Sequence, residues 1–129
     1  MVIDTSALIA YLEREPEADR VEERLLEADR LSISTATVVE CGIVMEARRG
    51  DGGGLELDLL LHRLGVELVP VDERHAELAR SAYRRFGKGR HPAGLNLGDC
   101  FSYALAQSTG QDLLYIGDDF SRTDIRGAL

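Results

Sequence analysis

The sequence predicts an α/β protein in which helices cover both faces of a central, mostly parallel sheet of four to five strands. Short apolar segments of strand length alternate along the chain with longer segments that have the 3.6-residue period of helices. The last apolar segment, residues 113–116, is continuous rather than alternating, as expected of a strand buried on both faces. Because strands that alternate with helices pair in parallel, these patterns indicate the doubly wound class.

The N-terminal part of the chain is expected to form a strand followed by two helices. Residues 2–3 form the strand, and capping side chains at 4–6 precede an apolar helix over 7–12. Pro16 fits the first turn of the second helix. This helix should be half exposed, because its apolar residues lie at helical spacing among Glu and Arg; they are Val21, Leu25 and Leu26.

The middle of the chain is expected to contain the second strand, two helices and a turn. Residues 31–34 alternate as a short strand, and Thr35 or Thr37 can cap the helix that follows. The glycine-rich segment 50–54 should end that helix in a flexible turn, and it is the only linker-like segment. A Leu-rich helix is expected over 55–64.

The C-terminal part is expected to add two strands and two helices. Residues 66–69 should form the third strand, and Asp72 can cap the helix after it. A loop rich in glycine and proline follows. Asn96 or Gly98 then begins the last helix, which precedes the strand over 113–116.

Size and composition restrict the class of protein. The 129 residues fit a single domain, 1–129, and the apolar and charged fractions of 44% and 29% are those of a folded, soluble chain. No apolar run approaches the roughly 20 residues needed to cross a bilayer, and no leader-like segment precedes the first strand. We therefore expect a cytoplasmic protein without a membrane partner. Cys41 and Cys100 should be small buried side chains rather than zinc ligands.

Acidic residues follow the predicted strands at the positions where such folds bind ligands. In open α/β sheets the ligand lies beyond the carboxyl ends of the strands, so we expect these carboxylates to converge. Each has apolar neighbours, so the carboxylates would repel one another and either rise in pKa or bind a cation. Oxygen ligands select Mg²⁺ or Mn²⁺, which suits phosphodiester hydrolysis. The residues are Asp4, Glu40, Asp99, Asp118 and Asp119.

Most of these acids also have an ordinary structural interpretation when taken singly. Asp4 can cap a helix, Asp99 can stabilise a helix dipole, and an Asp pair after a strand is usual in turns. Glu40 is the hardest to explain in this way, because its neighbours are mostly apolar. Their joint placement favours a functional cluster.

Four segments of the chain resemble the VapC-type toxins of the PIN-domain family in order and spacing. They read VIDTSALIA from Val2, TATVVE from Thr35, LNLGDCFSYALA from Leu95 and LLYIGDDFSRTDI from Leu113. The resemblance spans essentially the whole chain. It implies a PIN-like sandwich and a metal-dependent ribonuclease, using Mg²⁺ or Mn²⁺, that is the toxin of a type II toxin–antitoxin system.

The resemblance also implies roles for particular residues. Asp4, Glu40 and Asp99 occupy the family's metal-binding positions, and the fourth acid is Asp119 or Asp118, of which we favour Asp119. Other side chains would support the site through hydroxyl and carboxyl groups; these are Thr5, Ser6, Thr123 and Asp124.

The resemblance further implies a homodimer and a VapB-like antitoxin whose apolar segment packs on the toxin and blocks the acids. The sequence offers two candidate surfaces for these contacts. They are the Leu-rich helix over 55–64 and the pair Leu25–Leu26.

One basic stretch offsets the acidic character of the chain. The formal net charge is −8, which argues against a nucleic-acid partner, but no acid occurs from Leu78 to Gly98. This stretch leads to Asp99, so we expect it to guide RNA toward the acids, although it could also be a solvated helix face and loop. The candidate RNA-binding residues are Arg84, Lys88 and Arg90.

The alternative from another class is a non-catalytic signalling or interaction module of receiver type. Such a module needs paired acids after the first strand, an Asp after the third and a Lys after the last. Here Asp4 stands alone, Pro70 ends the third strand, and no Lys follows Lys88. Cleavage of RNA by the purified chain would separate the two interpretations.

Overall fold

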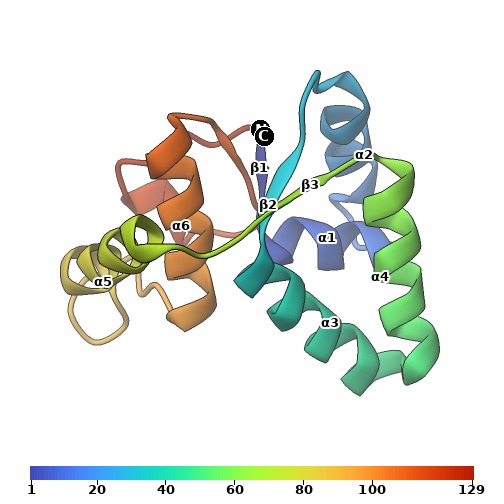
Figure 1. Ribbon diagram of the computed structural model, residues 1–129, viewed down its shortest axis with the longest axis horizontal. Coiled ribbons are helices and arrows are strands. Elements are labelled where there is room, and N and C mark those ends of the chain that lie inside the picture. Colours follow the sequence, from blue (N-terminus) through green and yellow to red (C-terminus); the bar gives the residue numbers. More distant parts are fainter.

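The computed structural model describes residues 1–129 and has a central sheet of four parallel strands in the order β3-β2-β1-β4 (Figure 1). Every strand pair is parallel, as the sequence predicts, and the strand number lies at the lower end of the predicted range. The strands are short: β1 (Val2–Ile3), β2 (Ser32–Ser34), β3 (Glu67–Val69) and β4 (Leu113–Leu114).

Two helices connect each strand to the next. None of them combines the length and apolarity that crossing a membrane requires. A 3₁₀ turn, η1 (Phe120–Arg122), follows β4. The helices are α1 (Thr5–Leu12), α2 (Ala18–Glu27), α3 (Thr35–Arg49), α4 (Asp51–Arg63), α5 (Glu73–Phe86) and α6 (Leu97–Thr109).

The helices divide into two groups, one on each face of the sheet. Helices α1 to α4 lie on one side and α5 and α6 on the other, as Figure 1 shows. Successive side chains of a strand point to opposite faces of the sheet, and so reach different helix groups. Ile3 belongs to the core under α1 to α4, and Val2 belongs to the core under α5 and α6. Leu114 and Leu113 divide in the same way. Both faces of the sheet are therefore covered at β1, β2 and β4, whereas the edge strand β3 is largely exposed.

Helix caps set the start of most helices. Asp4, Asp72 and Asn96 each accept a hydrogen bond from a backbone N–H of the first turn, as expected. The prediction of Thr35 or Thr37 as the cap of α3 was wrong. Ser34 is the cap, because it retains the extended backbone of β2 while its Oγ accepts from the Ala36 N–H at 3.3 Å.

The predicted flexible turn over residues 50–54 was also wrong. Helix α4 begins at Asp51 and includes the three glycines, so the connection is Gly50 alone, at a φ of 68°. Packing explains the glycines. A Cβ on Gly53 would overlap the Met45 carbonyl group, and one on Gly54 would meet the Glu46 carboxyl at 2.6 Å. They let α4 pack closely against α3.

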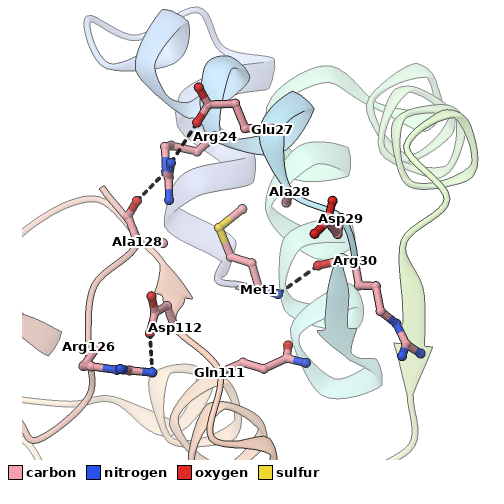
Figure 2. A pocket seen from close by; sticks show the side chains of 10 residues that line it. All are labelled: Met1, Arg24, Glu27, Ala28, Asp29, Arg30, Gln111, Asp112, Arg126 and Ala128. Carbon is pink, nitrogen blue, oxygen red and sulfur yellow. Dashed lines mark hydrogen bonds and ion pairs between the residues drawn. The ribbon is translucent and has the colours of Figure 1, made fainter.

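The termini lie together at the amino-terminal edge of the sheet, beside a cavity of about 470 Å³. Figure 2 shows that the charged groups around it bind one another: the Met1 ammonium donates to the Arg30 carbonyl at 2.8 Å, and Arg24 Nε donates to the Ala128 carbonyl at 2.7 Å. Arg126 lies 2.9 Å from Asp112. Burial lowers the pKa of the Met1 ammonium. These contacts hold each end of the chain to the segments that line the cavity.

Candidate active site

The acids gather at the opposite edge, where the strands end. Asp4 follows β1, and its backbone N–H donates to the carbonyl of Leu114 at the end of β4 at 3.0 Å. In the sheet, β1 lies between β2 on one side and β4 on the other, so the strand order reverses at β1. Such a reversal leaves a crevice beyond the carboxyl ends of the two strands, and Asp4 lies at it.

Asp4 is only 3% exposed, and three hydrogen bonds hold its carboxylate. Oδ2 accepts from the Ser6 backbone N–H at 3.0 Å and from Ser6 Oγ at 2.6 Å. Oδ1 accepts from Ser102 Oγ at 2.6 Å. Ser6 Oγ also accepts from the Ile116 N–H at 3.0 Å, which joins the start of α1 to the segment after β4. The predicted role of Ser6 in supporting the acids is consistent with these contacts.

Ser102 belongs to a buried chain of hydroxyl groups. Its Oγ lies 3.2 Å from Thr37 Oγ1, and both side chains are at most 1% exposed. Because the Ser102 proton is directed to Asp4, Thr37 donates to Ser102. The sequence reasoning missed both residues. The available signal was Ser102 itself, a polar residue in the apolar run of α6, one helical turn after Asp99.

Glu40 lies in the second turn of α3 and reaches across to α1 and α6. Its Oε1 accepts from Thr5 Oγ1 at 2.5 Å, so the second predicted hydroxyl also contacts a carboxylate. The Glu40 carboxyl rests on Gly98, where a Cβ would coincide with it. Gly98 is therefore a site residue that the sequence reasoning treated only as a possible helix start.

Asp99 lies in the first turn of α6 and is 9% exposed. Its Oδ2 accepts from the Asn96 backbone N–H at 2.9 Å, while Asn96 Oδ1 accepts from the Asp99 N–H at 2.9 Å, which forms a capping box. Burial raises the pKa of Asp99 to about 7, against the effect of the Asn96 hydrogen bond. Repulsion from Asp4, Asp119 and Glu40 raises it further.

The two acids after β4 differ in their surroundings. Asp119 begins η1, and its charge contributes to the raised pKa of Asp99. Asp118 instead acts on Tyr115, because after burial its charge is the second cause of the raised pKa of that phenol. Asp118 lines a separate cavity of about 380 Å³ that also includes Glu17. Asp119 is thus the acid that acts on Asp99.

Thr123 and Asp124 do not hydrogen-bond to the acids. Thr123 Oγ1 donates to the Phe120 carbonyl at 2.7 Å. Asp124 accepts from Tyr103 Oη at 2.8 Å and from Arg85 Nη2 at 3.2 Å. Burial opposes ionisation of Asp124, but these two hydrogen bonds outweigh it and lower its pKa. The contacts anchor the segment that carries Asp119, so any support they give is indirect.

The donor set fits a hard divalent cation. None of the acids after the strands pairs with an Arg, Lys or His, and their charges act on one another instead. No three His, Cys, Asp or Glu side chains lie close enough to form a complete ligand cage. Mg²⁺ commonly takes only one or two protein carboxylates and keeps several waters, so carboxylates alone suit it. Cys41, next to Glu40, is buried and its pKa is raised to about 12, chiefly by burial, which disfavours a thiolate ligand.

The predicted RNA-binding cations lie apart from the acids. Arg84 is on α5, Lys88 and Arg90 are in the loop before α6, and all three are exposed. Arg90 lies over the ring of Tyr83, 5.8 Å from its centroid. These residues form a basic surface beside the start of α6.

Fold and site together define an α/β protein with carboxylates at the crevice of a parallel sheet, of which Asp4 and Asp99 are buried, in an arrangement suited to a divalent cation. The chain belongs to the PIN domain family, whose sequence model matches residues 1–126. The resemblance to the VapC type is likewise confirmed by curated relatives.

Among these relatives is the ribonuclease VapC30 of Mycobacterium tuberculosis, 58% identical over 97% of this chain and 95% of its own length. A ribonuclease VapC of Mycolicibacterium smegmatis is 56% identical over 97% of both chains. Among solved structures, the sarcin–ricin loop cleaving toxin VapC20 of M. tuberculosis has a TM-score of 0.79 at 16% identity, covering 96% of this chain and 95% of its own. A toxin–antitoxin complex from Klebsiella pneumoniae has a TM-score of 0.72 at 18% identity, covering 95% and 92%.

Proposed function

We propose that this chain is a metal-dependent ribonuclease that acts in the cytoplasm as the toxin of a type II toxin–antitoxin system, through a single PIN domain over 1–129. The observation that carries the proposal is the buried Asp99, whose pKa is raised by burial and by the charges of Asp4, Asp119 and Glu40. Ionised acids that repel one another without a basic partner are stabilised by a bound cation. The relatives named as VapC ribonucleases support RNA as the substrate.

Asp4, Glu40, Asp99 and Asp119 would surround Mg²⁺ or Mn²⁺, one or two of them binding the ion directly and the others through its waters. Asp119 is favoured over Asp118 because only Asp119 acts on Asp99. When bound, the ion would neutralise negative charge on the phosphodiester during hydrolysis. The other side chains keep the acids in place. Ser6 and Ser102 orient the two oxygens of Asp4, and Thr5 orients Glu40.

The test is cleavage of single-stranded RNA in Mg²⁺ by the wild type and by Asp99→Asn, which removes the charge and keeps the shape. We expect the rate to fall by about 10²- to 10³-fold, as when one electrostatic contact to a developing charge is lost. Asp58→Asn, on the exposed face of α4, is the matched control and should cleave at the wild-type rate. Unchanged cleavage by Asp99→Asn would remove Asp99 from the mechanism.

A second pair of variants decides the fourth acid. Asp119→Asn should impair cleavage and Mn²⁺ binding, whereas Asp118→Asn should change neither by much, because the charge of Asp118 acts on Tyr115 and not on Asp99. Calorimetric titration of Mn²⁺ into each variant measures binding without relying on activity. The opposite pattern would assign the role to Asp118.

Metal binding to the native state alone should stabilise it by mass action. An ion at 100 times its dissociation constant adds about 2.7 kcal/mol to the free energy of unfolding. Thermal melts in Mn²⁺ should therefore show a higher Tm for the wild type and a smaller increase for Asp4→Asn. Equal increases in both would show that the ion binds elsewhere.

For protein partners we propose a VapB-like antitoxin and a second copy of the chain. The sequence-based candidate surfaces need correction, because Leu25 is 3% exposed and belongs to the core, as do Leu57, Leu60 and Leu61. The exposed leucines in those segments are Leu26, Leu55 and Leu59.

A further apolar pair, Val39 and Ile43, lies one turn apart on α3, at 60% and 62% exposure. We assign the antitoxin to the α4 leucines and the second copy to this α3 pair, since large exposed apolar side chains favour protein contacts. Light scattering should show a dimer that Ile43→Glu dissociates and Leu59→Glu does not. Loss of antitoxin binding only in Leu59→Glu would complete the assignment, and the reverse result would exchange the two surfaces.

A further inference from the structure

A groove of about 810 Å³ lies between α5 and the first turn of α6, outside the acidic site. Its apolar lining includes Ala79, Leu97 and Phe101, with Tyr83 on one wall. Leu97 is 75% exposed and Tyr83 is 41% exposed, unusually open for side chains of this size. The groove has the size of a small-molecule binding site. We call it the α5–α6 groove.

Cations surround the groove and no acid lines it. Arg80, Arg84 and Lys88 contribute to its lining, and Arg90 reaches over the ring of Tyr83. All four are exposed, and none forms an ion pair with Asp or Glu. In a chain of net charge −8, four unpaired cations around one apolar groove indicate a ligand that is both anionic and partly apolar.

We propose that the α5–α6 groove binds an unpaired base of single-stranded RNA, with neighbouring phosphates on the surrounding cations. The proposal rests on the proposed ribonuclease function and deepens it. Aromatic side chains beside a basic surface are the usual means of holding single strands, because bases stack on the rings while the cations bind the backbone. An exposed tyrosine, two apolar neighbours and four cations supply both parts here.

The groove is a subsite distant from the cleaved bond. Leu97 and Phe101 lie on one side of α6, whereas Asp99 and Ser102 face the acids on the other. A helix with its side chains is about 10–12 Å across, so an RNA strand in the groove must pass the end of α6 to reach Asp99. The bound base is therefore separated from the scissile phosphate along the strand. It contributes to affinity and to positioning of the strand rather than to the chemistry.

The test measures binding of a fluorescein-labelled single-stranded RNA of about ten nucleotides by anisotropy, in EDTA so that it stays intact. Stacking on an aromatic residue contributes about 1–3 kcal/mol per base, so Tyr83→Leu should weaken binding about 5- to 150-fold. Tyr83→Trp, which keeps an aromatic face, should restore binding. Leu97→Asp should also weaken it, because it places a carboxylate in the groove.

The matched control is Leu68→Asp, which adds the same charge at an exposed leucine of β3, on the far edge of the sheet. It should bind RNA like the wild type. Circular dichroism melts confirm that each variant is folded. The same RNA annealed to its complement should bind less tightly to the wild type and lose little affinity in Tyr83→Leu, since its bases are paired.

Cleavage assays in Mg²⁺ separate failure of this proposal from failure of the proposed function. If the wild type cleaves RNA but Tyr83→Leu and Leu97→Asp have wild-type Kd and KM, the base subsite is refuted and the ribonuclease stands. If the wild type neither binds nor cleaves RNA, the proposed function fails and the subsite with it. If Leu97→Asp instead dissociates an oligomer in light scattering while its RNA affinity is unchanged, the groove holds a second copy and the proposal is wrong.

Discussion

Gly98 leaves space for the Glu40 carboxyl, so Gly98→Ala should move a site acid without unfolding the protein. A Cβ at this position would coincide with the carboxyl group. The colliding atoms belong to the end of a flexible side chain rather than to the backbone, so Glu40 can turn away. By turning it gives up the 2.5 Å hydrogen bond from Thr5.

Gly98→Ala should affect stability and activity to different extents. Alanine within α6 gains about 0.8–1.0 kcal/mol of helix propensity over glycine, while the lost Thr5 hydrogen bond costs about 0.5–1.5 kcal/mol. These nearly cancel, so the Tm should change by no more than about 4 °C. Activity should respond more strongly, because a displacement of about 1 Å at a reacting group can cost about 10²-fold in rate.

The assay compares Mg²⁺-dependent RNA cleavage and thermal melts of the wild type, Gly98→Ala and Gly52→Ala. Gly52 is a matched control, since it is also helical and a Cβ there meets nothing within 4 Å. Gly52→Ala should gain stability and keep full activity. Wild-type cleavage by Gly98→Ala would refute the role given to the Glu40 position, and unfolding of Gly98→Ala would show that the backbone cannot tolerate the contact.

Three more predictions follow from the site and the basic surface. Burial raises the pKa of Asp99 in the folded state from 3.8 to about 7, so the unfolded state loses this proton at a lower pH than the folded state. The free energy of unfolding without metal should therefore fall as the pH rises from about 4 to about 7. Urea melts in EDTA should show that fall in the wild type, and a variant Asp99→Asn with the same pH slope would contradict it. Ser102→Ala removes the donor to Asp4 Oδ1, so the Mn²⁺ affinity measured by calorimetry should fall about 10- to 100-fold. Ser102→Thr keeps the hydroxyl and should restore the affinity. Wild-type affinity in the alanine variant would leave the hydroxyl with a packing role only. Replacing three cations of the basic surface with alanine should weaken RNA binding and flatten its salt dependence, while Mn²⁺ binding stays unchanged. A wild-type salt dependence in this variant would show that the basic surface does not bind RNA. The three cations are Arg84, Lys88 and Arg90.

Most of the fold follows from local patterns in the sequence. The apolar pairs at residues 2–3 and 113–114 become buried strands, and capping side chains such as Asp72 begin helices where they are expected. The error at residues 50–54 arose because glycine has two uses that look alike in a sequence. Gly50 supplies a positive φ, as a turn requires, whereas Gly53 removes a side chain where two helices approach closely. The second use depends on tertiary contacts.

The placement of several acids at the ends of the strands could be predicted from the sequence, but the side chains that hydrogen-bond to them could not. Acids that follow parallel strands converge at one edge of the sheet, so the position of Asp4 follows from topology. Asp99 instead reaches this edge from the first turn of α6, after a loop. The hydrogen bond from Ser102 to Asp4 joins residues 98 positions apart, and no local pattern indicates it. Asp118 and Asp119 are likewise equivalent in the sequence until η1 directs them to different neighbours.

The pairing of β4 beside β1 determines when during synthesis the sheet becomes complete. Val2 pairs with Leu113, so β1 gains its second neighbour only after the more than one hundred residues between them have been made. Contacts this distant in sequence form late and slowly during folding. The acids are likewise far apart in the sequence, because Asp4 follows β1 and Asp119 follows β4. A chain truncated before β4 therefore lacks both a sheet neighbour of β1 and the Asp119 carboxylate, and we expect it to be inactive.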